Sequence, residues 1–147
     1  MSDKCLLFDL NGTLIYRAQQ SKVVIRPFAW NVLKLLSKKY KIYIATSMIY
    51  KNVIKILYKM DPMWKTIITR IFDRNYTIPL ATDQKPFGTL RNVPKIIQEL
   101  QVDIETIVFI DNDLYKYQQC KVEVIIVPTF DGNEKDEYLN TLLEILW

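Results

Sequence analysis

Three apolar segments of the 147-residue sequence lead to side chains that could take part in chemistry. "CLLFDL" contains Asp9, "KIYIAT" ends at Thr46, and "TIVFID" ends at Asp111. In "FDLNGTLI" an apolar run stops at an aspartate and a glycine turn follows, a pattern that suits an aspartate used as a nucleophile at a strand end. Because the carboxyl ends of parallel strands lie side by side, we expect the three side chains to share one site.

More oxygen-bearing residues follow the last of these segments. Asp111, Asn112 and Asp113 are consecutive, and carboxylate and amide oxygens are ligands for hard cations such as Mg²⁺. The sequence contains no histidine and only two cysteines, which excludes Ser-His-Asp and Cys-His catalysis and the common zinc sites. An enzyme with this composition must rely on carboxylates, hydroxyls, Lys or Arg, and a metal bound through oxygen.

Strand-like and helix-like segments alternate along the chain and must position these side chains. Clear strands are predicted at residues 5–10, 41–46, 106–111 and 122–127. Helices are predicted at residues 27–40, 49–60, 94–101 and 134–146. The strand segments are continuously apolar, which is typical of a parallel sheet covered on both faces. We therefore predict a single α/β domain over residues 1–147, with a Rossmann-like parallel sheet flanked by helices.

The segment between residues 61 and 94 is less clear. Within it, "TIITRIFD" has the composition of a strand, whereas "NYTIPLATDQKPFGTLRNVP" is rich in loop-forming residues and supports no assignment. Nearer the N-terminus, the β-branched segment "KVVI" is a candidate for one additional strand.

Charge and hydropathy limit the possible partners. The net charge of +4 permits an anionic partner, although a mixed, solvated surface is the more common explanation. No stretch approaches the roughly 18 apolar residues of a membrane-spanning helix, and the charged N-terminal residues do not resemble a secretory signal. Cys5 and Cys120 are expected to be reduced thiols. These features predict an intracellular protein, cytoplasmic or nuclear, with no membrane contact.

Three motifs resemble those of the haloacid-dehalogenase-like (HAD) superfamily. "FDLNGTL", "IYIATS" and "IVFIDND" are similar to its first, second and fourth motifs, and they occur in the same order. "IRPFAWNVLKLLSKKYKIYIATS" and "FIDNDLYKY" resemble the branch of small phosphatases that act on the RNA polymerase C-terminal domain. The resemblance covers roughly residues 4–130 and implies a HAD core with a minimal cap.

The resemblance implies a Mg²⁺-dependent phosphatase that works through an aspartyl-phosphate. Asp9 would be the nucleophile that attacks phosphorus. The Mg²⁺ would be held by the carboxylate of Asp9, the backbone carbonyl of Asn11, and the side chain of Asp111 or Asn112. Thr46 would donate a hydrogen bond to a phosphoryl oxygen.

The loop after the nucleophile departs from the family pattern at one position. Gly12 permits the turn that exposes backbone N–H groups, and Thr13 is expected to brace that loop. At Asn11, however, the family usually has a second aspartate that protonates the leaving oxygen and later activates water. Such acid–base help is worth about 10²–10⁴-fold in rate. Since an amide can orient a group but cannot transfer a proton, we expect slowed or substrate-restricted catalysis.

The family's third motif supplies a cation, and the sequence offers three candidates for it. Lys85 in "QKPF" matches the Lys-Pro style of this motif and is favoured first. Arg91 in "TLRNVPKI" aligns with a lysine of other relatives and is favoured second. Lys95 has the shorter spacing to Asp111 that is usual in the small phosphatases of this branch.

The short spacing between motifs leaves no room for a substantial cap domain. Only about 30 residues separate the first and second motifs, and fewer than 40 separate the second and third. An open cleft favours a phosphate carried on a macromolecule. Four aromatic residues are candidates for its rim, although such residues more often lie in a core: Tyr16, Tyr50, Tyr76 and Phe87.

Three functional hypotheses follow. The first is a Mg²⁺-dependent phosphatase that acts on phosphoserine or phosphothreonine in a protein. The second is a catalytically weakened relative that serves as a protein-binding scaffold, for which Asn11 and the uncertain third motif are the evidence. The third is a polynucleotide-end phosphatase, which the mild basicity permits but no nucleic-acid motif supports.

Overall fold

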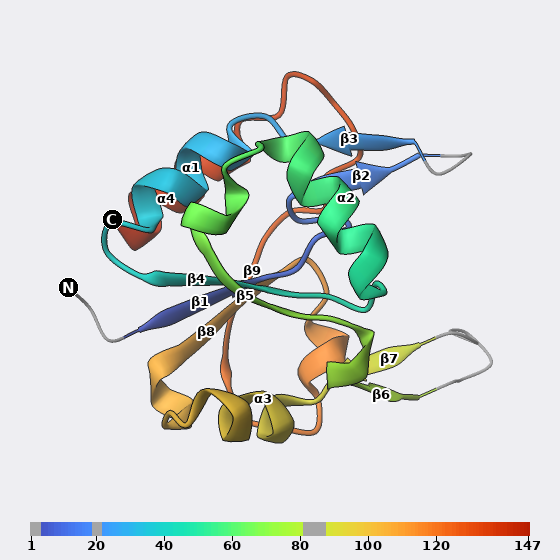
Figure 1. Cartoon of the computed structure of the whole chain (residues 1–147), viewed down its shortest axis with the longest axis vertical. Helices are drawn as coiled ribbons and strands as arrows, with labels where there is room; N and C mark the ends of the chain where they lie inside the picture. The colour runs from blue at the N-terminus through green and yellow to red at the C-terminus, as the bar shows by residue number, and fades with distance from the viewer. Residues whose placement is uncertain (1–3, 19–21, 81–87) are drawn as a thin grey trace.

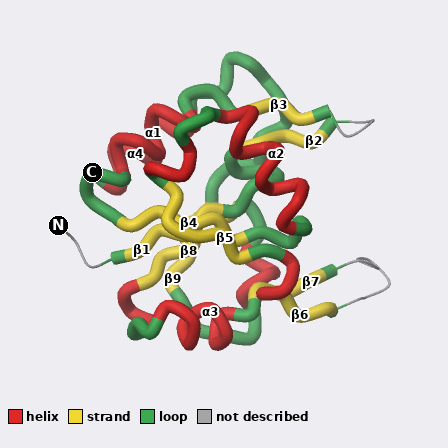
Figure 2. Tube along the Cα trace, in the orientation of Figure 1, coloured by secondary structure: helices red, strands yellow, loops and turns green. Residues whose placement is uncertain are grey.

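The computed structural model describes residues 4–18, 22–80 and 88–147. Its centre is a five-stranded sheet in which every neighbouring pair of strands is parallel, in the order β5-β4-β1-β8-β9 (Figures 1 and 2). The strands are β1 (Cys5–Phe8), β4 (Lys41–Ala45), β5 (Ile68–Phe72), β8 (Ile107–Asp111) and β9 (Glu123–Ile126). The predicted Rossmann-like α/β fold is therefore confirmed, with β1 in the middle of the sheet.

Helices cover both faces of the sheet, which explains why its strands are apolar throughout. In Figure 1, α1 (Ala29–Leu36), α2 (Tyr50–Met60) and α4 (Tyr138–Leu146) lie on one face, and α3 (Val93–Leu100) lies on the other. Alternate side chains of β1 contribute to two separate cores, with Leu6 on the side of α1 and Leu7 on the side of α3. Burial on both faces removes a continuous apolar surface from water, which stabilises the sheet.

Two antiparallel hairpins extend the fold beside the sheet (Figure 1). The segment "KVVI" is confirmed as a strand, because β3 (Val23–Ile25) pairs with β2 (Ile15–Arg17). The unassigned segment contains the second hairpin, formed by β6 (Thr77–Pro79) and β7 (Thr89–Arg91).

The first and last helices are shorter than their sequence patterns suggested, for local reasons. Phe28 has a left-handed backbone with φ of 69°, so α1 begins after it rather than at Pro27. The last helix was expected from residue 134 and begins at Tyr138. There, the Asp136 carboxylate accepts a hydrogen bond from the Tyr138 backbone N–H at 3.1 Å.

Within the described residues, none of the helices has the length and apolar character needed to cross a membrane.

Candidate active site

Asp9 and Asp111 follow adjacent positions on the two central strands. Phe8 is paired with Ile110 across β1 and β8, and the backbone N–H of Asp9 donates to the Ile110 carbonyl at 2.9 Å. Both carboxylates are buried, with Asp9 3% exposed and Asp111 fully covered. The sheet register itself therefore holds the two acids side by side.

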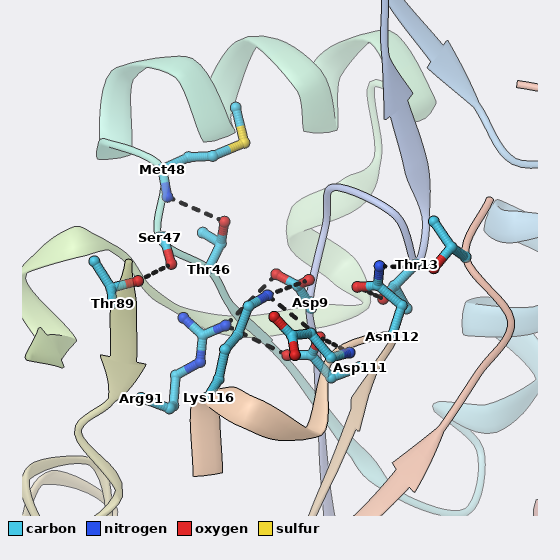
Figure 3. Close-up of polar contacts among 12 residues, drawn as sticks. Asp9, Thr13, Thr46, Ser47, Met48, Thr89, Arg91, Asp111, Asn112 and Lys116 are labelled. Carbon is cyan, nitrogen blue, oxygen red and sulfur yellow. Dashed lines mark hydrogen bonds and ion pairs between the residues drawn. The ribbon is translucent and has the colours of Figure 1, made fainter. Parts of the chain in front are cut away.

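Two cations lie against this pair of acids (Figure 3). The Nζ of Lys116 is 3.0 Å from Asp9 Oδ2 and 3.3 Å from Asp111 Oδ1. The Nη2 of Arg91 is 3.5 Å from Asp9 Oδ1 and 3.5 Å from Asp111 Oδ2. Two carboxylates and two cations thus form a four-charge cluster with no net charge, and we use that name for these four residues below.

Burial alters the acidity of the nucleophile candidate. Loss of solvent raises the pKa of Asp9 to about 6, although Lys116 beside it acts in the opposite direction. The neighbouring Asp111 adds to the increase, and Arg91 opposes it. The carboxylate is therefore ionised mainly above about pH 6, which includes neutral pH.

Tyr117 fixes the position of Asp111. Its hydroxyl donates to Asp111 Oδ2 at 2.7 Å, and the backbone N–H of Asp113 donates to Asp111 Oδ1 at 3.0 Å. Burial raises the pKa of Tyr117 well above its ordinary value, so the phenol remains a donor. Each oxygen of Asp111 therefore has both a hydrogen bond and a cation.

Arg91 is the third-motif candidate that the structure brings to the acids. Its side chain is completely buried, and within the described residues its guanidinium nitrogens make ion pairs but no hydrogen bond. Burial alone would lower the pKa of Arg91, but Tyr117, Asp9 and Asp111 together raise it. A permanently charged group with unused N–H donors is suited to bind the oxygens of an anion.

The other two candidates for this cation are not part of the four-charge cluster as described. Lys95 turns away, because its Nζ donates to the Asn75 carbonyl at 2.8 Å and lies over the ring of Tyr76. Lys85, which the sequence favoured first, lies outside the described residues.

Sequence reasoning missed Lys116. It lies on the short 3-10 helix η5 (Leu114–Tyr117), which begins three residues after Asp111 and turns the chain back toward the strand end. The available signal was "DNDLYKY", in which a lysine follows the fourth motif within one tight turn.

Thr46 lies at the same edge of the sheet as the acids. It follows β4, and its backbone N–H donates to the Phe72 carbonyl at 2.9 Å. Its Oγ1 accepts a hydrogen bond from the Met48 N–H at 3.2 Å, and within the described residues its hydroxyl hydrogen is available to a ligand (Figure 3). Ser47 and Thr89 share a hydrogen bond of 2.8 Å nearby.

The loop after Asp9 packs closely against Asn112. Gly12 has φ of +86°, a conformation that favours glycine. Asn112 Oδ1 accepts from the Thr13 hydroxyl at 3.5 Å, and its Nδ2 donates to the Thr129 hydroxyl at 3.2 Å. The structure thus places Asn112 against the loop, whereas Asp111 faces Asp9 and its cations.

Arg26 also holds the loop that follows Asp9. Its Nη1 donates to the Thr13 carbonyl at 3.0 Å, and its Nε and Nη2 bind the two oxygens of Asp136 at 2.8 and 3.0 Å. The backbone N–H of Phe130 also donates to the Gly12 carbonyl at 2.8 Å. The loop is therefore held by the segment of the chain around residues 130–136.

A cavity of about 710 Å³ opens onto Asp9. Asn11, Thr46 and Lys116 line it together with Asp9, and two further cations, Arg17 and Arg74, also line its wall. Among the described residues, the aromatic side chain that lines it is Tyr115. Of the predicted aromatics, Tyr50 and Tyr76 line a different depression beside β5, Tyr16 packs near Gly132, and Phe87 lies outside the described residues.

The ligand types at the site fit a Mg²⁺ ion. Within the described residues, no group of three or more His, Cys, Asp and Glu side chains could hold a metal. Asp9 and Asp111 nevertheless converge on a single ammonium group, so their oxygens face one region, and Asn11 lines the adjoining cavity. Mg²⁺ is commonly bound by one or two carboxylates, with waters and phosphate as its other ligands.

The following solved structures are similar in fold but distant in sequence. The fission yeast RNA polymerase II CTD phosphatase Fcp1, bound to beryllium fluoride, is 13% identical with a TM-score of 0.63. The match covers 98% of this chain and 50% of that chain, so the chain spans half the length of that phosphatase. A HAD family enzyme from Bacteroides thetaiotaomicron, in complex with magnesium and inorganic phosphate, is 11% identical with a TM-score of 0.66. This match covers 94% of the present chain and 98% of the Bacteroides chain.

A haloacid dehalogenase-like hydrolase from Streptococcus pneumoniae is 10% identical with a TM-score of 0.63, over 96% of this chain and 90% of that one. A search of curated proteins found no match. At these identities the structural likeness shows the fold, and the family follows from the sequence. Residues 4–147 match the family described as NLI interacting factor-like phosphatase, and the chain therefore belongs to that family, within the HAD superfamily.

Proposed function

We propose that the chain is a Mg²⁺-dependent phosphatase that forms an aspartyl-phosphate on Asp9 and acts on phosphoserine or phosphothreonine in a protein. The observation that supports this most is the four-charge cluster, of which Asp9 and Lys116 line the cavity while Arg91 and Asp111 lie buried against them. It combines an ionisable nucleophile with positive charge for the phosphoryl oxygens.

In the first step, one oxygen of the Asp9 carboxylate attacks phosphorus, the bond from phosphorus to the leaving oxygen breaks, and the leaving oxygen takes a proton from water. The burial that raises the pKa of Asp9 to about 6 also makes its carboxylate a stronger base and nucleophile once ionised. In the second step, water attacks the same phosphorus and gives up a proton to solvent, the bond from phosphorus to the Asp9 oxygen breaks, and phosphate is released with Asp9 restored.

The remaining residues of the site bind the phosphoryl group. Arg91 offers unused N–H donors, and the hydroxyl of Thr46 is available at the neighbouring strand end. Mg²⁺ held by Asp9, the carbonyl of Asn11, and Asp111 or Asn112 would neutralise the charge of nucleophile and phosphate together. Asn11 lines the cavity and can orient the leaving oxygen or the water without transferring a proton.

The surroundings of the cavity support a macromolecular substrate. In the described part of the chain, the insertions on either side of β4 contribute hairpins and core helices, with no separate cap domain. Arg17 and Arg74 add positive charge to the cavity wall, which favours an anionic ligand. A phosphorylated peptide segment can enter such a site, and the similarity to a CTD phosphatase supports a protein substrate. Cys5 and Cys120 are not joined in a disulfide, which suits a reducing intracellular compartment, cytoplasmic or nuclear.

Asn11 favours a second candidate function, a phosphopeptide-binding scaffold with little turnover. In that case the cavity and its cations bind the phosphate, and hydrolysis is slow because no second aspartate moves the proton.

The deciding experiment is Mg²⁺-dependent hydrolysis of an aryl phosphate and of phosphoserine peptides. Wild type, Asp9→Asn and the control Asp103→Asn, which removes an exposed carboxylate at the start of η4 (Ile104–Thr106), are compared. We expect turnover by wild type and the control, and none by Asp9→Asn. Trapping of acid-stable or hydroxylamine-sensitive phosphoprotein with labelled substrate would identify the covalent intermediate.

Silence of wild type on every substrate would reject the phosphatase proposal. Phosphopeptide binding by that silent protein would then support the scaffold. Selective hydrolysis at DNA or RNA ends, with binding that weakens steeply with salt, would instead point to a polynucleotide-end phosphatase.

A further inference from the structure

The two cations of the four-charge cluster differ in how firmly they are held. Arg91 belongs to β7 and its side chain is completely buried. Lys116 belongs to the short helix η5, lines the cavity, and keeps 18% of its side chain exposed. Lysine also carries its charge on a flexible four-carbon chain. Lys116 is therefore the cation of this cluster that can move toward the cavity.

Lys116 also contacts the atoms that a divalent cation would use. Its Nζ lies 3.0 Å from Asp9 Oδ2 and 3.3 Å from Asp111 Oδ1, so one ammonium group serves both carboxylates. A metal ion bound by these two side chains would have to share their oxygens with that ammonium. At contact distance two positive charges repel strongly, above all where little solvent screens them.

The charge balance leads to the same conclusion. Asp9 and Asp111 carry two negative charges when ionised, and Arg91 and Lys116 already neutralise both. A divalent cation added to this arrangement would leave two uncompensated positive charges in a buried site. A phosphate dianion arriving in the cavity would restore neutrality and would also offer Lys116 new acceptors.

We propose that Lys116 is an internal counter-ion that competes with divalent metal for Asp9 and Asp111, and that phosphate draws it away from them. Lys116 pairs with the carboxylates in the resting protein and with the phosphate in the ligand complex. Metal and phosphate therefore bind cooperatively, and by linkage each increases the affinity for the other by the same factor. The inference rests on the proposed metal site but not on turnover.

The test measures Mg²⁺ affinity by titration calorimetry, without substrate. Wild type, Lys116→Met and the control Lys121→Met, which removes one exposed lysine beyond η5, are compared. We expect Lys116→Met to bind Mg²⁺ about tenfold more tightly than wild type, because one contacting positive charge is lost. The control is expected to stay within about twofold of wild type, as distant exposed charges are screened by salt.

A second titration repeats the measurement in saturating inorganic phosphate, with wild type and Lys116→Met. We expect phosphate to increase the Mg²⁺ affinity of wild type, and to do so less in Lys116→Met. Unchanged or weaker Mg²⁺ binding by a folded Lys116→Met would overturn the proposal, and so would a wild-type affinity that phosphate does not increase.

Stability measurements cover the case in which the methionine variant folds poorly. Removing Lys116 leaves two neighbouring carboxylates with one cation, so the metal-free variant is expected to melt at a lower temperature than wild type. Added Mg²⁺ should then raise the melting temperature of Lys116→Met, or of the more polar Lys116→Gln, by more than it raises that of wild type. The proposal would be contradicted if Mg²⁺ raised the melting temperature of both variants by no more than it raises that of wild type. If the wild-type protein hydrolyses no substrate, the proposed function is rejected, but the results of these binding measurements still stand.

Discussion

The side chain of Asn112 lies directly against the α-carbon of Gly12. A β-carbon added at Gly12 would come within 2.3 Å of Asn112 Nδ2 and 2.8 Å of its Cγ. The loop after the nucleophile and the turn after β8 therefore approach each other as closely as the absence of a side chain permits.

This contact predicts a local effect of Gly12→Ala on the site. The substitution must displace Asn112 and also places a β-carbon at φ of +86°, which together should cost about 1–3 kcal/mol of unfolding free energy. We further expect Mg²⁺-dependent turnover per folded molecule to fall at least about tenfold, since small displacements at a reacting centre are costly. Urea denaturation and kcat measure the two effects.

Gly132→Ala is the matched control for this loop. Gly132 has a similar φ of +92°, and an added β-carbon would lie 2.8 Å from a ring carbon of Tyr16 rather than near Asn112. Although Gly132 belongs to the segment that holds the loop, its substitution should lower stability with a smaller loss of kcat than Gly12→Ala causes. Equal losses of kcat in the two variants would show that general destabilisation, and not the contact with Asn112, causes the effect.

The raised pKa of Asp9 predicts an unusual pH dependence for the metal-free protein. The folded protein holds a proton on Asp9 up to about pH 6, whereas the unfolded chain releases it near 3.8. Between these values the folded state binds more protons, so its unfolding free energy falls as the pH rises, by about 3 kcal/mol from this group. Asp9→Asn cannot titrate and should lack this decline. Denaturation at pH 4 and pH 7 with a chelator present measures the difference, and parallel pH profiles in the two proteins would contradict the prediction.

Asn11→Asp should increase turnover most for poor leaving groups. A second carboxyl group can protonate a serine or threonine oxygen, which is worth about 10²–10⁴-fold in comparable enzymes. An aryl oxygen leaves readily without that help, so we expect a smaller gain on an aryl phosphate. Asn52→Asp is the control, because Asn52 lines the same cavity and the variant adds the same charge. If Asn52→Asp produces the same pattern, the gain comes from charge in the cavity rather than from a proton shuttle.

The pair formed by Arg26 and Asp136 should be important for stability. The guanidinium is completely buried and the carboxylate is 18% exposed, so Asp136→Ala leaves a buried charge without its partner. We expect a loss of about 3–5 kcal/mol in unfolding free energy. The control Glu99→Ala breaks the ion pair between Glu99 and Arg70, whose side chains are 42% and 41% exposed, respectively. This control should lower the unfolding free energy by less than about 1 kcal/mol.

The pH dependence of this pair has the opposite sign to that of Asp9. Burial alone would raise the pKa of Asp136, but the hydrogen bonds from Arg26 and from the Tyr138 backbone lower it. The stabilisation is therefore present above the ordinary value of 3.8 and lost as the pH falls through the lower pKa of the folded state. A loss in Asp136→Ala that persists unchanged at strongly acid pH would contradict this account.

The fold was predictable because its information is local. Continuous apolar runs identify β1, β4 and β8, and an aspartate or threonine at their carboxyl ends locates Asp9, Thr46 and Asp111 at one edge of the sheet. The hairpin of β6 and β7 was not predicted, since each strand has three residues and one contains a proline. Strands this short carry too little pattern to be distinguished from loops.

The cations of the site were harder to predict than the acids. The acids occupy strand ends, whereas Arg91 reaches them from a hairpin and Lys116 from a 3-10 turn. Their positions depend on how peripheral segments fold back over the sheet, which no periodicity records. The link from Arg26 to Asp136 spans 110 residues and is equally invisible in the sequence.

The contacts from residues 130–136 to the loop after Asp9 have a consequence during protein synthesis. Asp9 leaves the ribosome well before its loop can be fully held. The Gly12 carbonyl gains its donor only when Phe130 has emerged, and Arg26, the donor to the Thr13 carbonyl, gains its carboxylate only when Asp136 has emerged. Until Asp136 emerges, the Arg26 guanidinium lacks the carboxylate that pairs with it in the folded protein. A nascent chain arrested before residue 130 should therefore hold the nucleophile in an unfinished loop, and the site becomes complete only after residues 130–136 have emerged.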